Sequence, residues 1–224
     1  MKKRGLIFML LACAAAAAAC VACGARAVEM PRADTSLPPA GVPAQPSSPR
    51  AVSPLSEDEE AINRRPLKLP LADPRIVIEK GARRLKLYAG GEVVRVRSIV
   101  LGFAPEGDKE KQGDGRTPEG EFYICMKNER SRFYLSLGLS YPNEEDAARG
   151  LRDGLITRAQ AASIVGAVRG NKCPPWGTAL GGEIFIHGGG TASDWTSGCV
   201  ALENAEVKEL FDAVPAGTVV RIEP

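Results

Sequence analysis

The sequence feature that most constrains the fold is a run of alternating apolar and polar residues that begins at Arg75. Its apolar stretches are Ile76-Val77-Ile78, Leu85-Lys86-Leu87-Tyr88 and Val93 to Leu101, and the last two flank the turn Gly90-Gly91. Alternation with a period of two gives each strand one buried side, and short turn segments between such runs are typical of antiparallel strands. The chain is therefore predicted to form a β-meander from residue 75 onward.

The remainder of the C-terminal part is predicted to add further strands and a few helices. The segment Gly102 to Gly120 is rich in Gly, Asp, Lys and Pro and is expected to be a long loop. Further strands are expected at Glu121 to Ile124, as a pair within 131–139, at Glu183 to Ile186 and at Gly217 to Ile222. Helices are expected after Asn143, after a capping box that starts at Thr157, and over Asn204 to Val214. The expected fold class is one mainly β domain with helical insertions.

The N-terminus has the pattern of an export signal. Met1-Lys2-Lys3-Arg4 precedes the apolar, Ala-rich stretch Leu6 to Ala19, which is short for a membrane span. Ala25-Arg26-Ala27 provides small residues for cleavage, so residues 1–27 are predicted to be a signal peptide and the protein to reside in the periplasm or cell envelope. Cys23, followed by Gly24, is an alternative processing site at which the chain would be lipidated and attached to a membrane. Otherwise the cysteines of this stretch are small apolar residues of a discarded segment.

Residues 28–74 are predicted to be a disordered linker, because they are rich in Pro, Ala and Ser and include the acidic cluster Glu57 to Glu60. Residues 75–224 are then long enough for a single folded domain with one core. The 29 basic and 27 acidic residues give +2, and cleavage after Ala27 removes four basic and no acidic residues, leaving −2. This balance argues against nucleic acid as a partner.

The single histidine of the chain, His187, follows an Ile-Phe-Ile strand and precedes Cys199 by twelve residues. An imidazole close to a thiol can take its proton and later protonate a leaving amine. Gly188 and Gly189 allow backbone and substrate to approach closely, and the N–H groups of Gly198 and Cys199 are candidates for an oxyanion hole. The alternative is a buried free cysteine and a hydrogen-bonded core histidine.

Other catalytic and binding patterns are missing from the sequence. It has no Gly-x-Ser-x-Gly elbow, and Gly113-Asp114-Gly115 lacks the Lys-Ser/Thr of a phosphate loop. One histidine with Cys125, Cys173 and Cys199 far apart gives no zinc spacing, so we expect no metal and no cofactor. In an oxidising compartment Cys125 and Cys173 are able to pair. The alternative is two independent buried thiols.

Several segments together resemble the L,D-transpeptidases of the YkuD type. The matches are Ile186-His187-Gly188, the box Thr196-Ser197-Gly198-Cys199 with Asn204 after it, the loop Gly113 to Phe122, and Leu135 to Asn143. The resemblance covers Arg75 to Glu223. Two positions depart from the family pattern: Ser197 stands where the box usually has a second histidine, and Ala201 stands where many members have an arginine. His187 is therefore the one imidazole available as a base.

The resemblance implies a mixed β-sandwich or barrel fold and a reaction on peptidoglycan stem peptides. Cys199 would attack the amide before a terminal D-Ala, His187 would act as general base and acid, and a backbone carbonyl near Gly188 or Gly189 would orient the imidazole. The acyl group would pass to an amine, giving a 3-3 cross-link, or to water. The residues expected to bind substrate are Arg116, Trp195, Thr196, Ser197 and Asn204.

Three functions remain open on the sequence alone. The first is an L,D-transpeptidase. The second is a hydrolase that uses the same thiol to trim stem peptides or to release a protein linked to the wall. The third is a wall-binding domain without activity, which the absence of the box histidine and arginine allows.

Overall fold

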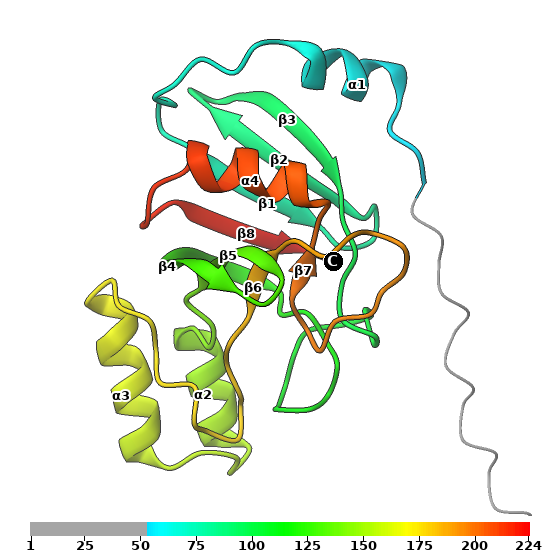
Figure 1. Ribbon diagram of the computed structural model, residues 1–224. Coiled ribbons are helices and arrows are strands. Elements are labelled where there is room, and N and C mark those ends of the chain that lie inside the picture. Colours follow the sequence, from blue (N-terminus) through cyan, green and yellow to red (C-terminus); the bar gives the residue numbers. More distant parts are fainter. Residues whose placement is uncertain (1–52) are drawn as a thin grey trace, which may run out of the picture. The chain divides into compact units, whose positions relative to one another are not determined.

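A curled sheet of eight strands organises residues 53–224, the part of the chain that the computed structural model describes (Figure 1). The predicted signal peptide, the lipidation site Cys23 and residues 28–52 of the predicted linker lie outside these residues. The strand order is β3-β2-β1-β8-β4-β5-β6-β7, with β1–β8 and β6–β7 parallel and the other pairs antiparallel. The strands are β1 (Arg75–Glu79), β2 (Arg84–Ala89), β3 (Glu92–Ser98), β4 (Gly120–Ser131), β5 (Tyr134–Leu139), β6 (Phe185–His187), β7 (Val200–Ala201) and β8 (Val219–Glu223). The prediction of a mainly β domain with helical insertions is confirmed.

The predicted meander is present as β1, β2 and β3, which pair in antiparallel order. Its alternation produces the expected burial: Ile76 and Ile78 of β1 and Leu85 and Leu87 of β2 have no exposed surface. These side chains join residues of β4 to β8 in one apolar core. Burial of a side chain of this size stabilises a fold by about 1.5–3 kcal/mol, so this core is the main source of stability.

The two edge strands of the sheet are brought together just after β3. Val100 and Ala201 of β7 exchange backbone hydrogen bonds of 3.0 and 2.9 Å. Because β3 and β7 stand at opposite ends of the strand order, this pairing curls the sheet into a half-barrel around its core. It also fixes the segment that precedes β7.

Three of the four helices were expected from the sequence, namely α2 (Glu144–Arg152), α3 (Arg158–Arg169) and α4 (Asn204–Ala213). Asn143 and Thr157 cap α2 and α3 as predicted. These two helices pack together around a second, smaller apolar cluster and lie apart from the meander (Figure 1), while α4 packs on the main core. Within residues 53–224 no helix combines the length and apolarity that crossing a bilayer requires.

Helix α1 (Glu57–Arg64) differs from the expected disordered linker, which was predicted to extend to residue 74. Ser56 and Glu59 form a capping box at its start. Asn63 then bonds to both backbone groups of Val96 in β3, at 2.7 and 2.9 Å. The composition of this segment suggested disorder, but a cap and a tertiary contact together stabilise a short helix.

The expected strand pair within 131–139 is instead a hairpin between β4, which ends at Ser131, and β5, which starts at Tyr134. Tyr134 has a positive φ of 75° at the turn. The turn therefore falls on Arg132 and Phe133, which form the tip of the hairpin.

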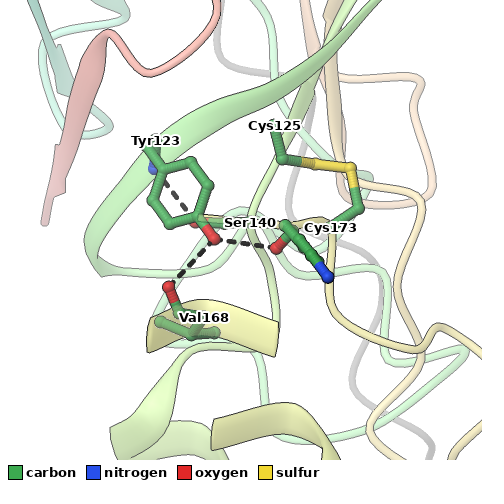
Figure 2. The surroundings of a disulfide bond; sticks show 6 residues. Tyr123, Cys125, Ser140, Val168 and Cys173 are labelled. Atoms are coloured by element: carbon green, nitrogen blue, oxygen red, sulfur yellow. Dashed lines mark hydrogen bonds between the residues drawn. A yellow bond between two sulfur atoms is a disulfide. The ribbon is translucent and has the colours of Figure 1, made fainter. Parts of the chain in front are cut away.

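A disulfide joins Cys125 of β4 to Cys173, in the loop after α3 (Figure 2). The hydroxyl of Tyr123, two residues before Cys125 on β4, donates to the backbone carbonyl of Lys172 at 2.7 Å and lies 3.3 Å from that of Val168. These bonds tie the end of α3 to the sheet. Of the two sequence alternatives for Cys125 and Cys173, the structure has the bridged one, and Cys199 is a free thiol.

Candidate active site

Cys199 and His187 are brought to one cavity by two short parallel strands. His187 is the last residue of β6, Cys199 immediately precedes β7, and the register aligns Ile186 with Val200 and His187 with Ala201. Both side chains line a cavity of about 790 Å³. The pair predicted from the sequence thus shares one accessible space.

The imidazole of His187 is held by the peptide group that follows it. Its Nδ1 lies 2.5 Å from the carbonyl oxygen of Gly188, and the N–H of Gly189, in the same peptide group, donates to Asn204 Oδ1 at 3.0 Å. A donor at Nδ1 leaves Nε2 unprotonated and able to accept a proton. A Cβ at Gly188 would lie 2.4 Å from Asn204 Oδ1 and 2.9 Å from the Phe133 carbonyl oxygen, so only glycine fits there.

Two aromatic rings enclose the imidazole. Phe133, at the tip of the β4–β5 hairpin, stacks on His187 with a centroid distance of 4.6 Å and an interplanar angle of 20°. Trp195 and His187 meet edge to face with their ring centroids 5.5 Å apart, and Nε1 of Trp195 donates to the Gly190 carbonyl at 3.3 Å. This apolar enclosure buries the ring and thereby lowers the pKa of His187 below its usual 6.5, with the charge of Arg132 acting in the same direction against the hydrogen bond to Gly188.

The thiol of Cys199 is neutral in this environment. Its Sγ donates to the backbone carbonyl of Glu183 at 3.5 Å. Burial raises the pKa of Cys199, although a backbone hydrogen bond from Phe185 and the charges of Lys109 and Arg132 oppose this shift. Since His187 is also neutral near pH 7, the resting state is a thiol and an imidazole rather than a thiolate and an imidazolium.

The residues before Cys199 form a tight turn organised by Thr196. The Thr196 hydroxyl donates to the Cys199 carbonyl at 2.7 Å and accepts from the Gly198 N–H at 3.1 Å. Gly198 has a φ of 127°, and a Cβ there would lie 2.6 Å from the Arg116 carbonyl oxygen. Of the two predicted oxyanion donors, Gly198 therefore already has a partner, whereas the Cys199 N–H has no hydrogen bond within the described part of the chain.

The other predicted substrate-binding residues lie at different places. Trp195, Thr196 and Ser197 line the cavity, and Asn204 lies behind it at the first turn of α4. Arg116 is not among the lining residues, because its guanidinium bonds to the Asp108 carbonyl at 3.1 Å and to Glu110 at 3.0 Å. It is the backbone of Arg116 that borders the turn before Cys199, because its carbonyl oxygen lies beside Gly198.

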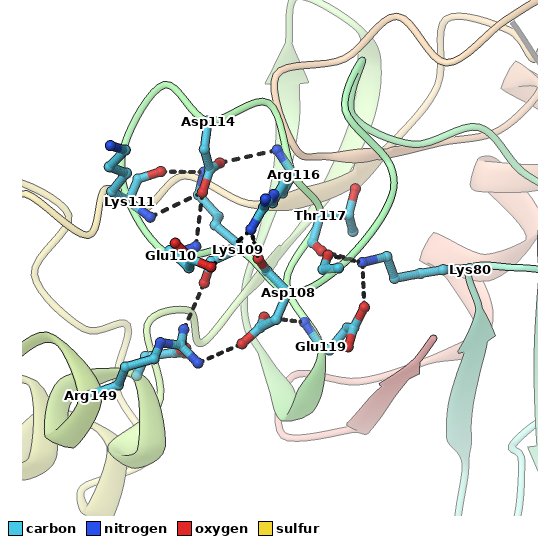
Figure 3. A network of polar contacts seen from close by, with 12 residues as sticks. Lys80, Asp108, Lys109, Glu110, Lys111, Asp114, Arg116, Thr117, Glu119 and Arg149 are labelled. Atoms are coloured by element: carbon cyan, nitrogen blue, oxygen red, sulfur yellow. Dashed lines mark hydrogen bonds and ion pairs between the residues drawn. The ribbon is translucent and has the colours of Figure 1, made fainter. Parts of the chain in front are cut away.

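The long loop that contains Arg116 is a network of internal polar contacts (Figure 3). Asp114 accepts from Lys109 Nζ at 2.7 Å and from the N–H groups of Glu110, Lys111 and Arg116; burial acts to raise its pKa, but these bonds prevail and lower it. Buried Lys80 donates to Glu119 and to two backbone carbonyls of the loop. These contacts hold the loop that packs, through the backbone of Arg116, against the turn before Cys199.

The loop before Cys199 is also bound to the segments that flank β2 and β3. Asp194, next to Trp195, pairs with Arg83 at 2.7 Å, and both side chains are only 8% exposed. Asp194 also accepts from the Leu101 N–H at 2.8 Å. Neither residue was singled out from the sequence, because their contact joins positions 111 residues apart.

Further lining residues were also not predicted as site residues. They are Arg130, Arg132 and Phe133 from the β4–β5 hairpin, Lys109 from the long loop, and Trp176 and Glu183 from the segment before β6. Ser136 in β5 aligns with His187 in β6, and this register places the hairpin tip beside the imidazole. That register is a long-range contact, so no local sequence signal identified Phe133 as a site residue.

Comparison with known proteins gives a family and a set of distant structural relatives. The solved structures to which this chain is similar include an L,D-transpeptidase from Xylanimonas cellulosilytica (18% identity, coverage of 71% of this chain and 64% of that chain, TM-score 0.40). Another is the helical cell shape determining protein Pgp2 from Campylobacter jejuni (20%, 74% and 53%, TM-score 0.44). A third is an L,D-transpeptidase from Mycobacterium smegmatis (13%, 68% and 59%, TM-score 0.41). The chain spans about half to two thirds of the length of these relatives.

A search of curated proteins gives no significant match. The family model of the YkuD L,D-transpeptidase catalytic domain, in contrast, matches residues 73–222, which is most of the part that the structure describes. This range contains the cavity, both predicted catalytic residues and the loop around Arg116. The chain therefore belongs to the YkuD family, the family of L,D-transpeptidase catalytic domains.

Proposed function

We propose that this protein is a cysteine-dependent L,D-transpeptidase that acts on peptidoglycan stem peptides. The observation that carries the proposal is the arrangement of Cys199 and His187 in one cavity, with Nδ1 of His187 bound to Gly188 so that Nε2 is free to accept a proton. A buried free thiol with a structural histidine would not require an open cavity of about 790 Å³ at both side chains. The family membership supports the same substrate class.

The reaction begins from the neutral pair. Nε2 of His187 takes the thiol proton as Sγ of Cys199 attacks the amide carbonyl, and the Cys199 N–H stabilises the oxyanion. The imidazolium then protonates the leaving amine of D-Ala, and an acyl-enzyme remains on Cys199. An acceptor amine, deprotonated by His187, attacks the acyl group and restores the free thiol. Both neutral forms dominate near pH 7, so proton transfer accompanies attack and no preformed thiolate is needed.

Residues around the pair have supporting roles in this proposal. Asn204 holds the peptide that orients His187, Thr196 shapes the nucleophile turn, and Phe133 and Trp195 exclude water from the imidazole. Trp195 and Ser197, which line the cavity, are proposed to contact substrate. Preorganised catalytic groups depend on neighbouring contacts of this kind, which keep them in a fixed geometry.

We also propose that the protein is exported and that residues 75–224 form its catalytic domain. The Cys125–Cys173 disulfide supports an oxidising compartment, since such bridges are rare in reducing ones. Peptidoglycan lies outside the cytoplasmic membrane, so substrate and redox environment agree. Fractionation of the cells that produce the protein, with N-terminal sequencing, tests both export and cleavage after Ala27. Protein found in the cytoplasm with residues 1–27 still attached would contradict export.

The decisive functional assay is incubation of the purified protein with disaccharide-tetrapeptide muropeptides, followed by chromatography and mass spectrometry. The transpeptidase predicts dimers joined by a 3-3 cross-link and release of D-Ala, with both products absent in Cys199→Ala. Tripeptide monomers alone would show that water is the acceptor and that the protein is a hydrolase. Muropeptides that stay unchanged after incubation with the folded protein would contradict the proposed activity.

A further inference from the structure

The cavity has an excess of positive charge on one wall. Among its lining residues within the described part of the chain, Lys109, Arg130 and Arg132 are basic and Glu183 alone is acidic. The two arginines come from the same β4–β5 hairpin, whereas Glu183 lies in the segment before β6. An anionic group that enters the cavity is therefore attracted toward the hairpin.

The three cations differ in how far their charge is already compensated. Lys109 is buried, and its Nζ bonds to Asp114 at 2.7 Å and to the Lys111 carbonyl at 3.1 Å. Arg130 and Arg132 have no acidic partner within residues 53–224. Arg116, expected from the sequence to supply a cation here, is paired with Glu110 outside the cavity lining. The uncompensated charge thus belongs to the hairpin.

Arg132 is the arginine that contacts the aromatic ring beside His187. Its guanidinium carbon lies 4.7 Å from the centroid of Phe133, and Phe133 stacks on His187 at 4.6 Å. The guanidinium and the imidazole therefore contact the same aromatic ring. Stacking on Phe133 also restrains the long side chain, which reduces the entropy lost when it binds a ligand.

The chemistry of the proposed donor supplies a matching anion. In a stem tetrapeptide the residue after the scissile amide is terminal, so its free carboxylate lies about 3.5 Å farther along an extended chain than the reacting carbonyl. The box position where many family members carry an arginine is Ala201 here, and Ala201 is fully buried. That position therefore offers no cation to the donor carboxylate in this chain.

We propose that Arg132 binds the carboxylate of the terminal residue of the acyl donor and thereby selects donors that end one residue after the scissile amide. This inference rests on the proposed transpeptidase function. A planar guanidinium binds a carboxylate through two parallel hydrogen bonds, which a lysine cannot reproduce. Arg130, near the end of β4, adds to the field but does not stack beside the imidazole.

The test compares two donors, a stem tetrapeptide with a free terminal carboxylate and the same peptide as its terminal amide. Release of the terminal residue is measured for the wild type and for Arg132→Gln, Arg130→Gln and Arg116→Gln. The wild type is expected to favour the carboxylate by about tenfold or more in kcat/KM, the usual range for a hydrogen bond to a charged group. Arg132→Gln is expected to reduce this ratio to below about twofold, because it raises KM for the carboxylate donor much more than KM for the amide donor.

The ratio of the two donors separates recognition from general damage to the site. Arg116→Gln and Arg130→Gln are expected to retain most of the discrimination. The proposal is overturned if Arg132→Gln slows both donors equally, if Arg116→Gln or Arg130→Gln abolishes the discrimination in place of Arg132→Gln, or if the wild type does not discriminate. Failure of the proposed function gives a different result, because then the wild type releases the terminal residue from neither donor.

Discussion

The Cys125–Cys173 disulfide is expected to be a large single contribution to stability. It joins positions 48 residues apart, between β4 and the loop after α3. Closing a loop of this length removes conformational entropy from the unfolded chain worth about 4 kcal/mol. The bridge also fixes the start of the segment 173–184, which supplies Trp176, Gly182 and Glu183 to the cavity. We therefore expect Cys125→Ala with Cys173→Ala to reduce the free energy of unfolding by about 2–4 kcal/mol and to raise KM.

Urea denaturation followed by circular dichroism measures this effect. A Cys199→Ala background prevents exchange of the free thiol with the bridge, so wild-type pairing is preserved in the reference protein. Tyr123→Phe is the matched control, because it removes the hydroxyl contacts of the same junction while the covalent bond remains, and it should cost only about 1 kcal/mol. A double alanine variant that loses less than about 1 kcal/mol, or no more than Tyr123→Phe, would refute the reasoning.

Three further predictions concern the site and its anchors. Burial lowers the pKa of His187 below its usual 6.5, so the acidic limb of the pH profile of kcat/KM should have its midpoint below pH 6.5. Burial raises the pKa of the Cys199 thiol above its usual 9.0, so the rate of its alkylation by iodoacetamide should still increase with pH above 9.0. A Cys199 thiol that titrates near neutral pH would contradict this prediction. Asn204→Ala should lower kcat about tenfold with little change in KM. Asn204→Asp, which keeps the acceptor for the Gly189 N–H, should retain kcat and move the acidic limb to higher pH. An equal loss of kcat in both variants would argue against the role of the hydrogen bond between Gly189 and Asn204. Asp194→Asn should destabilise the fold by about 3 kcal/mol, because it leaves Arg83 buried without a counter-charge, whereas Asp212→Asn in an exposed pair should cost at most about 1 kcal/mol in the same urea titration.

Local sequence patterns were sufficient to predict most of the fold. The alternation in 76–101 and the caps at Asn143 and Thr157 depend on residues that are neighbours in the chain, so the meander and helices α2 and α3 were predicted correctly. Helix α1 was missed because composition was given more weight than the capping box at Ser56. The curl of the sheet was beyond local reasoning, since it depends on Val100 meeting Ala201.

The site residues also divide into those that local sequence patterns predicted and those that depend on long-range contacts. His187 and Cys199 were found because their residue types and glycine neighbours carry a chemical pattern, and the structure places both in one cavity. Phe133 and Arg132 were not found, because they reach the cavity only through the register of β5 with β6. Arg116 was expected to face the substrate, but the acidic side chain of Glu110 in its own loop holds its guanidinium outside the cavity lining. Its role in binding stays a prediction, which the Arg116→Gln variant tests.

In the proposed reaction Cys199 forms an acyl-enzyme and His187 is the only base. The most direct measurement is the intact mass of the protein after incubation with a carbapenem, with the site of any adduct mapped by digestion. We expect one adduct on Cys199 in the wild type, no adduct in Cys199→Ala, and acylation slowed by about 10²-fold or more in His187→Ala. Wild-type protein that remains folded and unmodified, or a His187→Ala variant acylated at the wild-type rate, would contradict it.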